Sequence, residues 1–277
     1  MTFIVAEIGV NHNGNISLAE RLIDAAFAAG ANGVKFQTFD PKKLEPPGER
    51  RNVLESLKLR PKDHFSLKAK ADDLGLLFFS TPFDVDSLWF LVEELRVQIL
   101  KISSGSINDI NLLMAARLAR RPVVLSTGMS GWEEIKTAVD ILEQPALLHC
   151  VSAYPTPDDK IDLRAMVAMR SKFNLSVGLS DHTTSTLIPA LAVVLGAGVI
   201  EKHFTLSREM SGPDHHMSME PCSFRAMVEN IRTAEASLGS EEKTLRDVEK
   251  TTAGIVKQRL DWQKETICGT KIPSHLE

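Results

Sequence analysis

The chain has 277 residues, of which 43% are hydrophobic and 25% are charged, and its formal net charge is −4. This composition is typical of a soluble globular protein and excludes fibrous, disordered and disulfide-stapled chains. The 32 basic residues are balanced by 36 acidic ones and form no basic run, so the chain lacks the long-range field that nucleic-acid binding requires and no nucleic-acid partner is expected.

Short runs of β-branched and apolar residues alternate with longer amphipathic stretches. The eight runs predicted to be strands are Phe3–Ile8, Gly33–Thr38, Leu76–Ser80, Ile99–Ser103, Pro122–Ser126, Ala146–Val151, Leu175–Leu179 and Val199–Phe204. Each precedes a predicted helix: Leu18–Ala29, Pro61–Leu74, Val85–Leu95, Ile110–Arg120, Trp132–Leu142, Asp162–Lys172, Thr184–Gly196 and Ser223–Leu238. Eight βα units favour an α/β fold of the (β/α)8 TIM barrel type over an open sheet, because right-handed crossovers bring each strand beside a parallel neighbour.

Two segments lie outside this series. Asp40–Arg51 contains Pro46-Pro47-Gly48 and is predicted to be a polar loop after the second strand, a candidate mobile lid. Residues 1–240 are expected to form the barrel. Residues 241–277 are weakly patterned and are expected to form a peripheral helix or tail.

The N-terminus and the cysteines bear on where the protein resides. The N-terminus has no basic region followed by an apolar one, and no apolar run reaches about 18 residues, so no membrane partner is expected. Cys150, Cys222 and Cys268 show no CxxC spacing, which fits a reducing compartment. We therefore expect a cytoplasmic protein.

Hydroxyl residues gather where the predicted strands end, and in a barrel these ends surround one pocket. The third to seventh strands end in Ser80-Thr81, Ser103-Ser104, Ser126-Thr127, Ser152 and Ser180. Lys35 and Lys101 lie on the second and fourth strands, and Gly105 and Gly128 offer free backbone amides. A single serine here is explained by helix capping, but five together with two lysines favour a phosphate or carboxylate site.

Two histidines follow on the last strands. His182 ends the seventh strand and His203 lies near the end of the eighth, and by period-two alternation each shares a side with the residue two positions before it, Ser180 and Glu201 respectively. Both imidazoles would then reach one divalent ion, forming an open catalytic site for manganese, magnesium, cobalt or zinc. The alternative is that backbone carbonyl groups satisfy both rings.

Other polar residues give weaker signals. Glu7 is a carboxylate inside the first strand, which suggests an inward, partnered or catalytic role. His12 is predicted to be a turn residue, and the segment 212–216 either reaches the pocket or forms a solvated loop. His149 and Cys150 are adjacent on a strand, so they face opposite sides and no nucleophile pair is expected.

Nine segments at these strand ends carry a family resemblance: residues 6–14, 35–38, 80–83, 101–105, 125–129, 149–157, 178–183, 201–205 and 212–214. In this order they resemble the sialic acid synthase family, whose members condense phosphoenolpyruvate with N-acetylmannosamine or a related N-acetylated hexose. The resemblance extends from residue 3 to about residue 240 and implies a catalytic (β/α)8 barrel that releases phosphate and forms a nonulosonic acid.

The resemblance also implies roles for individual residues. The phosphate and carboxylate of phosphoenolpyruvate would be held by Lys35, Thr81, Lys101, Ser104, Ser126, Ser152 and Ser180. The divalent metal, with manganese expected and magnesium or cobalt as alternatives, would be bound by His182 and His203. The sugar or its protons would be handled by Glu7, Gln37, Tyr154 and Asp214, so that Glu7, Lys35, Lys101 and Asp214 form the catalytic set.

Two features depart from the family pattern. Many relatives carry an acidic residue where this chain has Ser106. Family members usually continue into a C-terminal antifreeze-like domain that covers the neighbouring subunit's site in a swapped dimer, and we expect no such domain within these 277 residues. A homodimer is expected here, with a separate antifreeze-like capping protein as one way to complete the site. Two other hypotheses are a Schiff-base aldolase that uses Lys35 or Lys101, and a non-catalytic or split-synthase barrel that binds these ligands.

Overall fold

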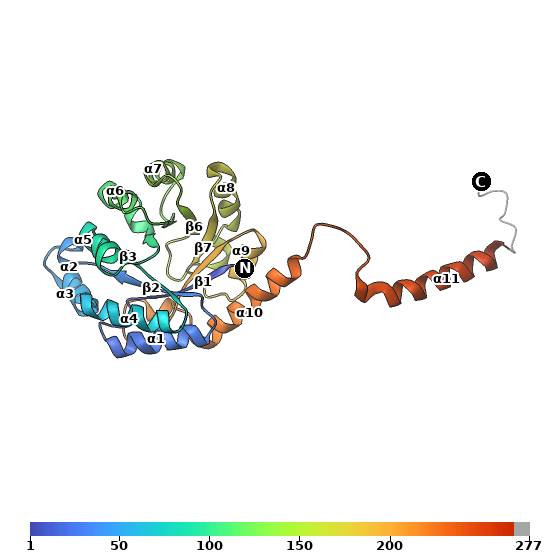
Figure 1. Ribbon diagram of the computed structural model, residues 1–277, viewed down its shortest axis with the longest axis horizontal. Coiled ribbons are helices and arrows are strands. Elements are labelled where there is room, and N and C mark those ends of the chain that lie inside the picture. The colour runs from blue at the N-terminus through green and yellow to red at the C-terminus, as the bar shows by residue number, and fades with distance from the viewer. Residues whose placement is uncertain (269–277) are drawn as a thin grey trace. The chain divides into compact units, whose positions relative to one another are not determined.

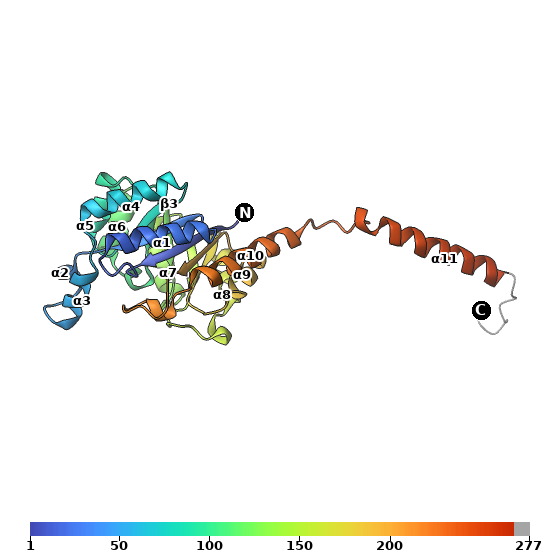
Figure 2. The ribbon, with the colours of Figure 1, turned by 90° about the horizontal axis from the view of Figure 1, so that it is seen from below.

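The computed structural model describes residues 1–268, and in residues 1–238 a ring of strands is surrounded by helices (Figures 1 and 2). The strands are β1 (Phe3–Gly9), β2 (Gly33–Thr38), β3 (Leu77–Pro82), β4 (Leu100–Ile102), β5 (Val123–Ser126), β6 (Ala146–Cys150), β7 (Val177–Asp181) and β8 (Val199–His203). The helices of this unit are α1 (Ile16–Ala28), α2 (Pro41–Leu44), α3 (Glu49–Leu57), α4 (Pro61–Asp73), α5 (Val85–Trp89), α6 (Ile110–Leu118), α7 (Trp132–Leu142), α8 (Leu163–Phe173), α9 (Ile188–Val194) and α10 (Pro221–Leu238).

The eight strands form one parallel sheet in the order β3-β2-β1-β8-β7-β6-β5-β4. The two end strands, β3 and β4, lie beside each other without forming a hydrogen-bonded ladder, so the sheet curls into a nearly closed barrel. Each strand after the first follows a crossover through at least one helix, as parallel neighbours require. The prediction of a (β/α)8 barrel is therefore confirmed.

The core lies between the strands and the inward faces of the helices. On α1, the buried residues Ala19, Leu22, Ile23 and Ala26 recur at the spacing of one helical face, which is what the sequence pattern predicted. Phe36 of β2 is fully buried and stacks on Phe78 of β3 with ring centroids 5.3 Å apart. Burial of these apolar surfaces holds each helix against its strands.

The predicted lid over Asp40–Arg51 is wrong as a loop, because the segment contains α2 and the start of α3. Asp40 caps α2 by accepting a hydrogen bond from Lys42 N, and Pro41 occupies its first turn. The two helices pack through Leu44, Leu54 and Leu57 around Val10 and Phe39, forming a small second core. None of the described residues 40–51 lines the cavity at the end of the barrel.

Several predicted bounds move by a few residues. β7 begins and ends two residues later than predicted, so Ser180 and Asp181 lie inside the strand. α9 begins at Ile188 instead of Thr184, and in the turn before it the Ser185 hydroxyl accepts hydrogen bonds from Leu187 N and Ile188 N.

The second unit begins at Gly239. Its described part holds a short 3-10 turn, Asp247–Glu249, and the helix α11, Lys250–Cys268. The side chain of Lys250 pairs with Asp247 at 2.7 Å. Over residues 1–268, no helix is both long and apolar enough to cross a membrane.

Candidate active site

A cavity of about 500 Å³ opens at the carboxyl ends of the strands. It brings together the thirteen residues to which the family resemblance assigns a role, namely Glu7, Lys35, Gln37, Thr81, Lys101, Ser104, Ser126, Ser152, Tyr154, Ser180, His182, His203 and Asp214. They come from the ends of all eight strands and from the segments that follow them. Parallel strands in a closed barrel end at the same face, which explains why residues far apart in sequence converge here.

The register of the strands sets which side chains are neighbours. Glu7 of β1 is paired with Lys35 of β2 on one side and with His203 of β8 on the other. Glu201 lies two residues before His203, and both line the cavity. Lys202 between them is buried and binds Asp181 at 2.6 Å, in keeping with the alternation of side chains along a strand.

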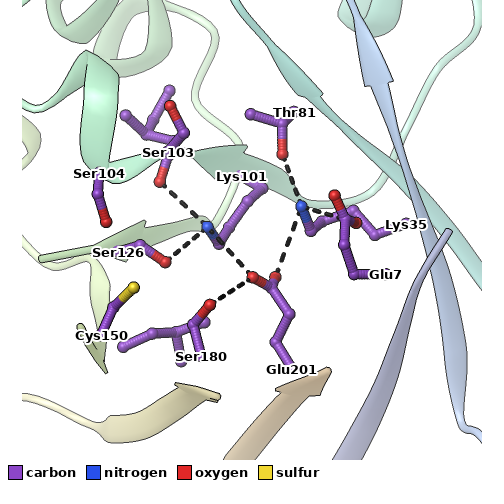
Figure 3. Close-up of polar contacts among 12 residues, drawn as sticks. Glu7, Lys35, Thr81, Lys101, Ser103, Ser104, Ser126, Cys150, Ser180 and Glu201 are labelled. Carbon is purple, nitrogen blue, oxygen red and sulfur yellow. Dashed lines mark hydrogen bonds and ion pairs between the residues drawn. The ribbon is translucent and has the colours of Figure 1, made fainter. Parts of the chain in front are cut away.

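Two buried lysines and two buried glutamates form a charge network at the base of the cavity (Figure 3). The Lys35 ammonium lies 2.8 Å from a Glu7 oxygen and donates to the Thr81 hydroxyl, also at 2.8 Å. The Lys101 ammonium donates to the Ser126 hydroxyl at 2.7 Å. All four charged groups are thereby held in fixed positions with little exposure to water.

Glu201 bridges the two lysines. Its two carboxylate oxygens lie 3.7 Å from the Lys35 ammonium and 3.6 Å from the Lys101 ammonium (Figure 3). The Ser180 hydroxyl donates to the same carboxylate at 2.9 Å. Removal of this one group would leave Lys101 without an acidic partner within 4 Å in the described part of the chain.

Burial and charge shift the pKa values in opposite directions within this network. Burial would raise the pKa of Glu201, but the ammonium groups of Lys101 and Lys35 outweigh it and hold the pKa at about 2. For Glu7, burial dominates over the attraction of Lys35 and raises the pKa to about 7. Burial lowers the pKa of Lys101. Glu201 is therefore a fixed anion, whereas Glu7 titrates in the range that suits general acid–base work.

Two histidines, a tyrosine and an aspartate also line the cavity. The rings of His182 and His203 have centroids 5.4 Å apart, and the Tyr154 ring lies 4.2 Å from the His182 ring. An oxygen of Asp214 lies 3.8 Å from His203 Nδ1. Burial raises the pKa of Tyr154 to about 12, so its phenol remains a hydrogen-bond donor.

The two imidazoles fit an open cation site. His182 Nδ1 lies 2.9 Å from the carbonyl oxygen of Val151, which can only accept, so Nδ1 carries a proton and, in the neutral ring, Nε2 carries the lone pair. His203 Nδ1 is buried and has no hydrogen-bond partner among the described residues. Within residues 1–268, no three His, Cys, Asp or Glu side chains form a ready-made cage, so the remaining ligands would come from water or substrate.

Some predicted hydroxyls do not face the cavity. Ser80 bonds Thr38 at 2.8 Å, and Thr127 donates to the carbonyl oxygen of Leu148 at 3.0 Å. These two hydroxyls bond groups on neighbouring strands, and neither caps a helix as the sequence analysis expected of a single strand-end hydroxyl. Ser106, which departs from the family pattern, is buried against Ser103 with their hydroxyl oxygens 3.1 Å apart and does not line the cavity.

The cavity also contains residues that sequence reasoning missed. Glu201 was placed on the same side as His203 but was given no role, although period-two alternation already put it in the pocket. Cys150 was discounted with His149, yet it lines the cavity with its sulfur 3.7 Å from His182 Nδ1. His149 itself bonds the carbonyl oxygen of Ile161 at 2.6 Å, as expected for the opposite face of the strand.

Chemically, the cavity combines ammonium and hydroxyl groups that could bind an anion with a carboxyl group that could transfer a proton and two imidazoles that could hold a cation. Ammonium and hydroxyl groups at the base suit an anionic ligand. Glu7 lies next to both kinds of group, since it contacts Lys35 and is paired in register with His203. Such a site can hold two substrates and transfer a proton between them.

Known proteins are similar to this chain over most of its length. Residues 22–243 match the model of the NeuB family. The chain is 39% identical to N,N'-diacetyllegionaminic acid synthase of Legionella pneumophila, covering 98% of this chain and 82% of that one. It is 34% identical to human N-acetylneuraminate-9-phosphate synthase, covering 88% and 73%. A crystal structure of N-acetylneuraminic acid synthetase from Leptospira borgpetersenii, in complex with citrate, superposes with a TM-score of 0.85 at 37% identity, covering 92% and 90%.

Proposed function

The chain belongs to the NeuB family, and from this membership we propose that it condenses phosphoenolpyruvate with an N-acetylated hexose to give a nonulosonic acid and inorganic phosphate. The proposal depends above all on the two buried ammonium groups of Lys35 and Lys101, which open with their hydroxyl partners onto one cavity. Burying a cation costs free energy unless an anion compensates its charge. An anionic substrate would provide such compensation in addition to the two glutamates.

Phosphoenolpyruvate is assigned to the base of the cavity. The residues proposed to hold its phosphate and carboxylate are Lys35, Thr81, Lys101, Ser104, Ser126, Ser152 and Ser180. Lys101 and Ser126 already touch at 2.7 Å, as do Lys35 and Thr81 at 2.8 Å, so each ammonium is oriented before the substrate arrives. Oriented donors in a dry site stabilise an anion without reorganisation, which is why they contribute to the rate.

The sugar is assigned to the part of the cavity lined by Gln37, Tyr154 and Asp214, which would contact it. The metal proposed for this site, manganese before magnesium or cobalt, would be held by His182 and His203. When bound there, the ion would supply Lewis-acid polarisation of the sugar aldehyde. The acceptor is proposed to be N-acetylmannosamine or a related diacetamido hexose.

The reaction balances with the groups present. The methylene carbon of phosphoenolpyruvate forms a bond to the aldehyde carbon of the open-chain sugar, whose oxygen takes up a proton. Water then adds to the former enol carbon and gives up one proton, which balances the proton taken up by the sugar oxygen. The hydroxyl group formed in this way becomes the keto group as the C–O bond to phosphate breaks, and phosphate leaves with its proton. Lys35 and Lys101 hold the charge of the departing phosphate, and Glu7, with its pKa raised to about 7 by burial, is proposed to move the proton.

Phosphate release tests the proposal. Purified protein, manganese and phosphoenolpyruvate are incubated with N-acetylmannosamine or with 2,4-diacetamido-6-deoxyhexoses, and both inorganic phosphate and the keto acid are measured. Phosphate and keto acid are expected in equal amounts with at least one sugar. If no hexose in this set supports phosphate release with manganese present, the proposed function is wrong.

Replacing either histidine should remove metal-dependent activity and leave the fold intact. His182→Ala or His203→Ala deletes one of the two imidazoles proposed to hold the ion, and at such sites the loss of even an outer partner costs about 10- to 100-fold. The measurement is activity against manganese concentration, with binding of Mn²⁺ followed by electron paramagnetic resonance. His149→Ala is the matched control, because that ring bonds a backbone carbonyl and lies outside the cavity. Unchanged Mn²⁺ binding in both site variants would contradict the metal assignment.

A Schiff-base aldolase is the second candidate, and the lowered pKa of Lys101, caused by burial, favours it. In that mechanism the neutral amine of Lys101 would attack the carbonyl carbon of a keto acid, and the carbinolamine formed would lose water to give an imine. Borohydride reduction in the presence of pyruvate would then add a stable mass to Lys101. Activity that requires manganese, with no trapped adduct, supports the synthase instead.

A further inference from the structure

Three polar side chains crowd around the Cα of Gly128, which lies two residues after the end of β5. A methyl carbon placed on Gly128 would lie 2.3 Å from the Ser152 hydroxyl oxygen, 3.0 Å from that of Ser104 and 3.2 Å from the Cys150 sulfur. Ser104 follows β4, whereas Cys150 ends β6 and Ser152 follows it, so the groups come from the two strands on either side of β5. All three side chains line the cavity.

The backbone does not explain why a glycine stands here. Gly128 is not among the glycines with positive φ, so an alanine would suit its backbone conformation. Space is what the position lacks. The glycine allows hydroxyls from two neighbouring strand ends to approach its backbone, which any side chain would prevent.

Gly128 also orients one of these hydroxyls directly. Its backbone N–H donates to the Ser104 oxygen at 2.9 Å. A serine oxygen has two acceptor sites and one proton, so this bond occupies an acceptor site and leaves the proton to be donated. The Cys150 sulfur nearby is only a weak acceptor, and an anionic oxygen in the cavity is a stronger one.

We infer that Gly128 is a positioning residue of the anion-binding base: its missing side chain and its backbone amide together set the Ser104 and Ser152 hydroxyls for the phosphate or carboxylate of phosphoenolpyruvate. The inference rests on the proposed function, since these serines are assigned to that substrate. Gly128 acts through the two serines and does not itself need to contact the reacting atoms.

Alanine at this position should spare the fold and damage the site. The closest atom to the added methyl group is the end of the Ser152 side chain, which can rotate to another staggered rotamer. That rotation relieves the overlap but moves the hydroxyl away from residue 128. We therefore expect weaker ligand binding and little change in the free energy of unfolding.

The test compares Gly128→Ala with Gly198→Ala in the full chain. Gly198 lies before β8 at the opposite end of the barrel, and a methyl group there meets nothing closer than 3.7 Å. For Gly128→Ala we expect the KM for phosphoenolpyruvate to rise about 10- to 100-fold, because hydrogen bonds to a charged group are misplaced. The KM for the sugar and the midpoint of thermal unfolding should stay near the wild-type values, and Gly198→Ala should match wild type throughout.

A double variant separates positioning from general damage. If Gly128→Ala acts by displacing Ser152, then adding Ser152→Ala should cost little more, and the effects of the two single changes should be far from additive. Additive effects, or a Gly128→Ala enzyme with wild-type KM for phosphoenolpyruvate, would overturn the inference. Calorimetric binding of phosphoenolpyruvate to the wild type is measured alongside. If the wild type binds phosphoenolpyruvate and releases phosphate, and Gly128→Ala does both equally well, only the inference about Gly128 is wrong. If the wild type neither binds phosphoenolpyruvate nor releases phosphate, the proposed function is wrong, and so is the inference that rests on it.

Discussion

Lys101→Met is expected to lower kcat/KM for phosphoenolpyruvate by about 30- to 4,000-fold. The Lys101 side chain is 2% exposed and its ammonium opens onto the cavity, so an anion bound there loses a desolvated charge partner. Losing one partner of such a pair costs about 2 to 5 kcal/mol, and each 1.4 kcal/mol is tenfold in an equilibrium or rate. Methionine keeps most of the length of the side chain, so the loss measures charge. The measurement is steady-state phosphate release with phosphoenolpyruvate varied at saturating sugar.

Lys202→Met is the matched control for this prediction. Lys202 is also 2% exposed and also lies on a barrel strand, but its ammonium binds Asp181 at 2.6 Å and does not line the cavity. Its replacement should lower the free energy of unfolding while the kcat/KM of the folded fraction stays within a few-fold of wild type. Equal losses of kcat/KM in the two variants would show that the loss does not depend on the position of the lysine in the cavity. That result would contradict the assignment of Lys101.

Glu201→Gln should cause the largest loss of stability among substitutions in the cavity. The carboxylate lies between two buried ammonium groups, at 3.7 Å from Lys35 and 3.6 Å from Lys101, and the amide would leave Lys101 without an acidic partner within 4 Å in the described residues. Removing one member of a buried charge pair typically costs about 3 to 5 kcal/mol. Urea unfolding followed by circular dichroism gives the change in free energy of unfolding.

The double variant Glu201→Gln/Lys101→Met tests the cause of that loss. With both members removed, Lys35 still has Glu7 at 2.8 Å and no cation is left unpartnered in the network. We therefore expect the double variant to recover a substantial part of the stability that Glu201→Gln loses. A double variant whose destabilisation equals the sum of the two single ones would show that the charges do not interact, contrary to the geometry.

The cavity residues on β2 and β7 could be predicted from the alternation of side chains along a strand. Lys35 and Gln37 lie two positions apart on one strand, as do Ser180 and His182 at the end of another, so each pair shares a side, and all four line the cavity. For Thr127 and Ser80 the same reasoning could not choose between the cavity and a hydrogen-bond partner on a neighbouring strand, because a hydroxyl suits either environment. Only the positions of neighbouring strands decide such cases.

Glu201 and Gly128 show the opposite limit. A carboxylate on a strand that also carries a lysine and a histidine gives no sign in the sequence of bridging two lysines from β2 and β4. The glycine between Thr127 and Met129 likewise gives no sign in the sequence that hydroxyls from other strands lie where its side chain would be. Both properties arise from groups on other strands, so they appear only when the barrel closes.

The sequence by itself determined the class of fold, the eight strand and helix units and the family, because hydrophobic periodicity and short motifs are local properties of the chain. Only the tertiary structure decided that the expected lid is a pair of helices packed on their own small core, that Glu201 is the shared partner of two lysines and that Gly128 makes room for two serines. The physical reason is that distances between atoms on different strands depend on register and barrel closure, which no single segment encodes.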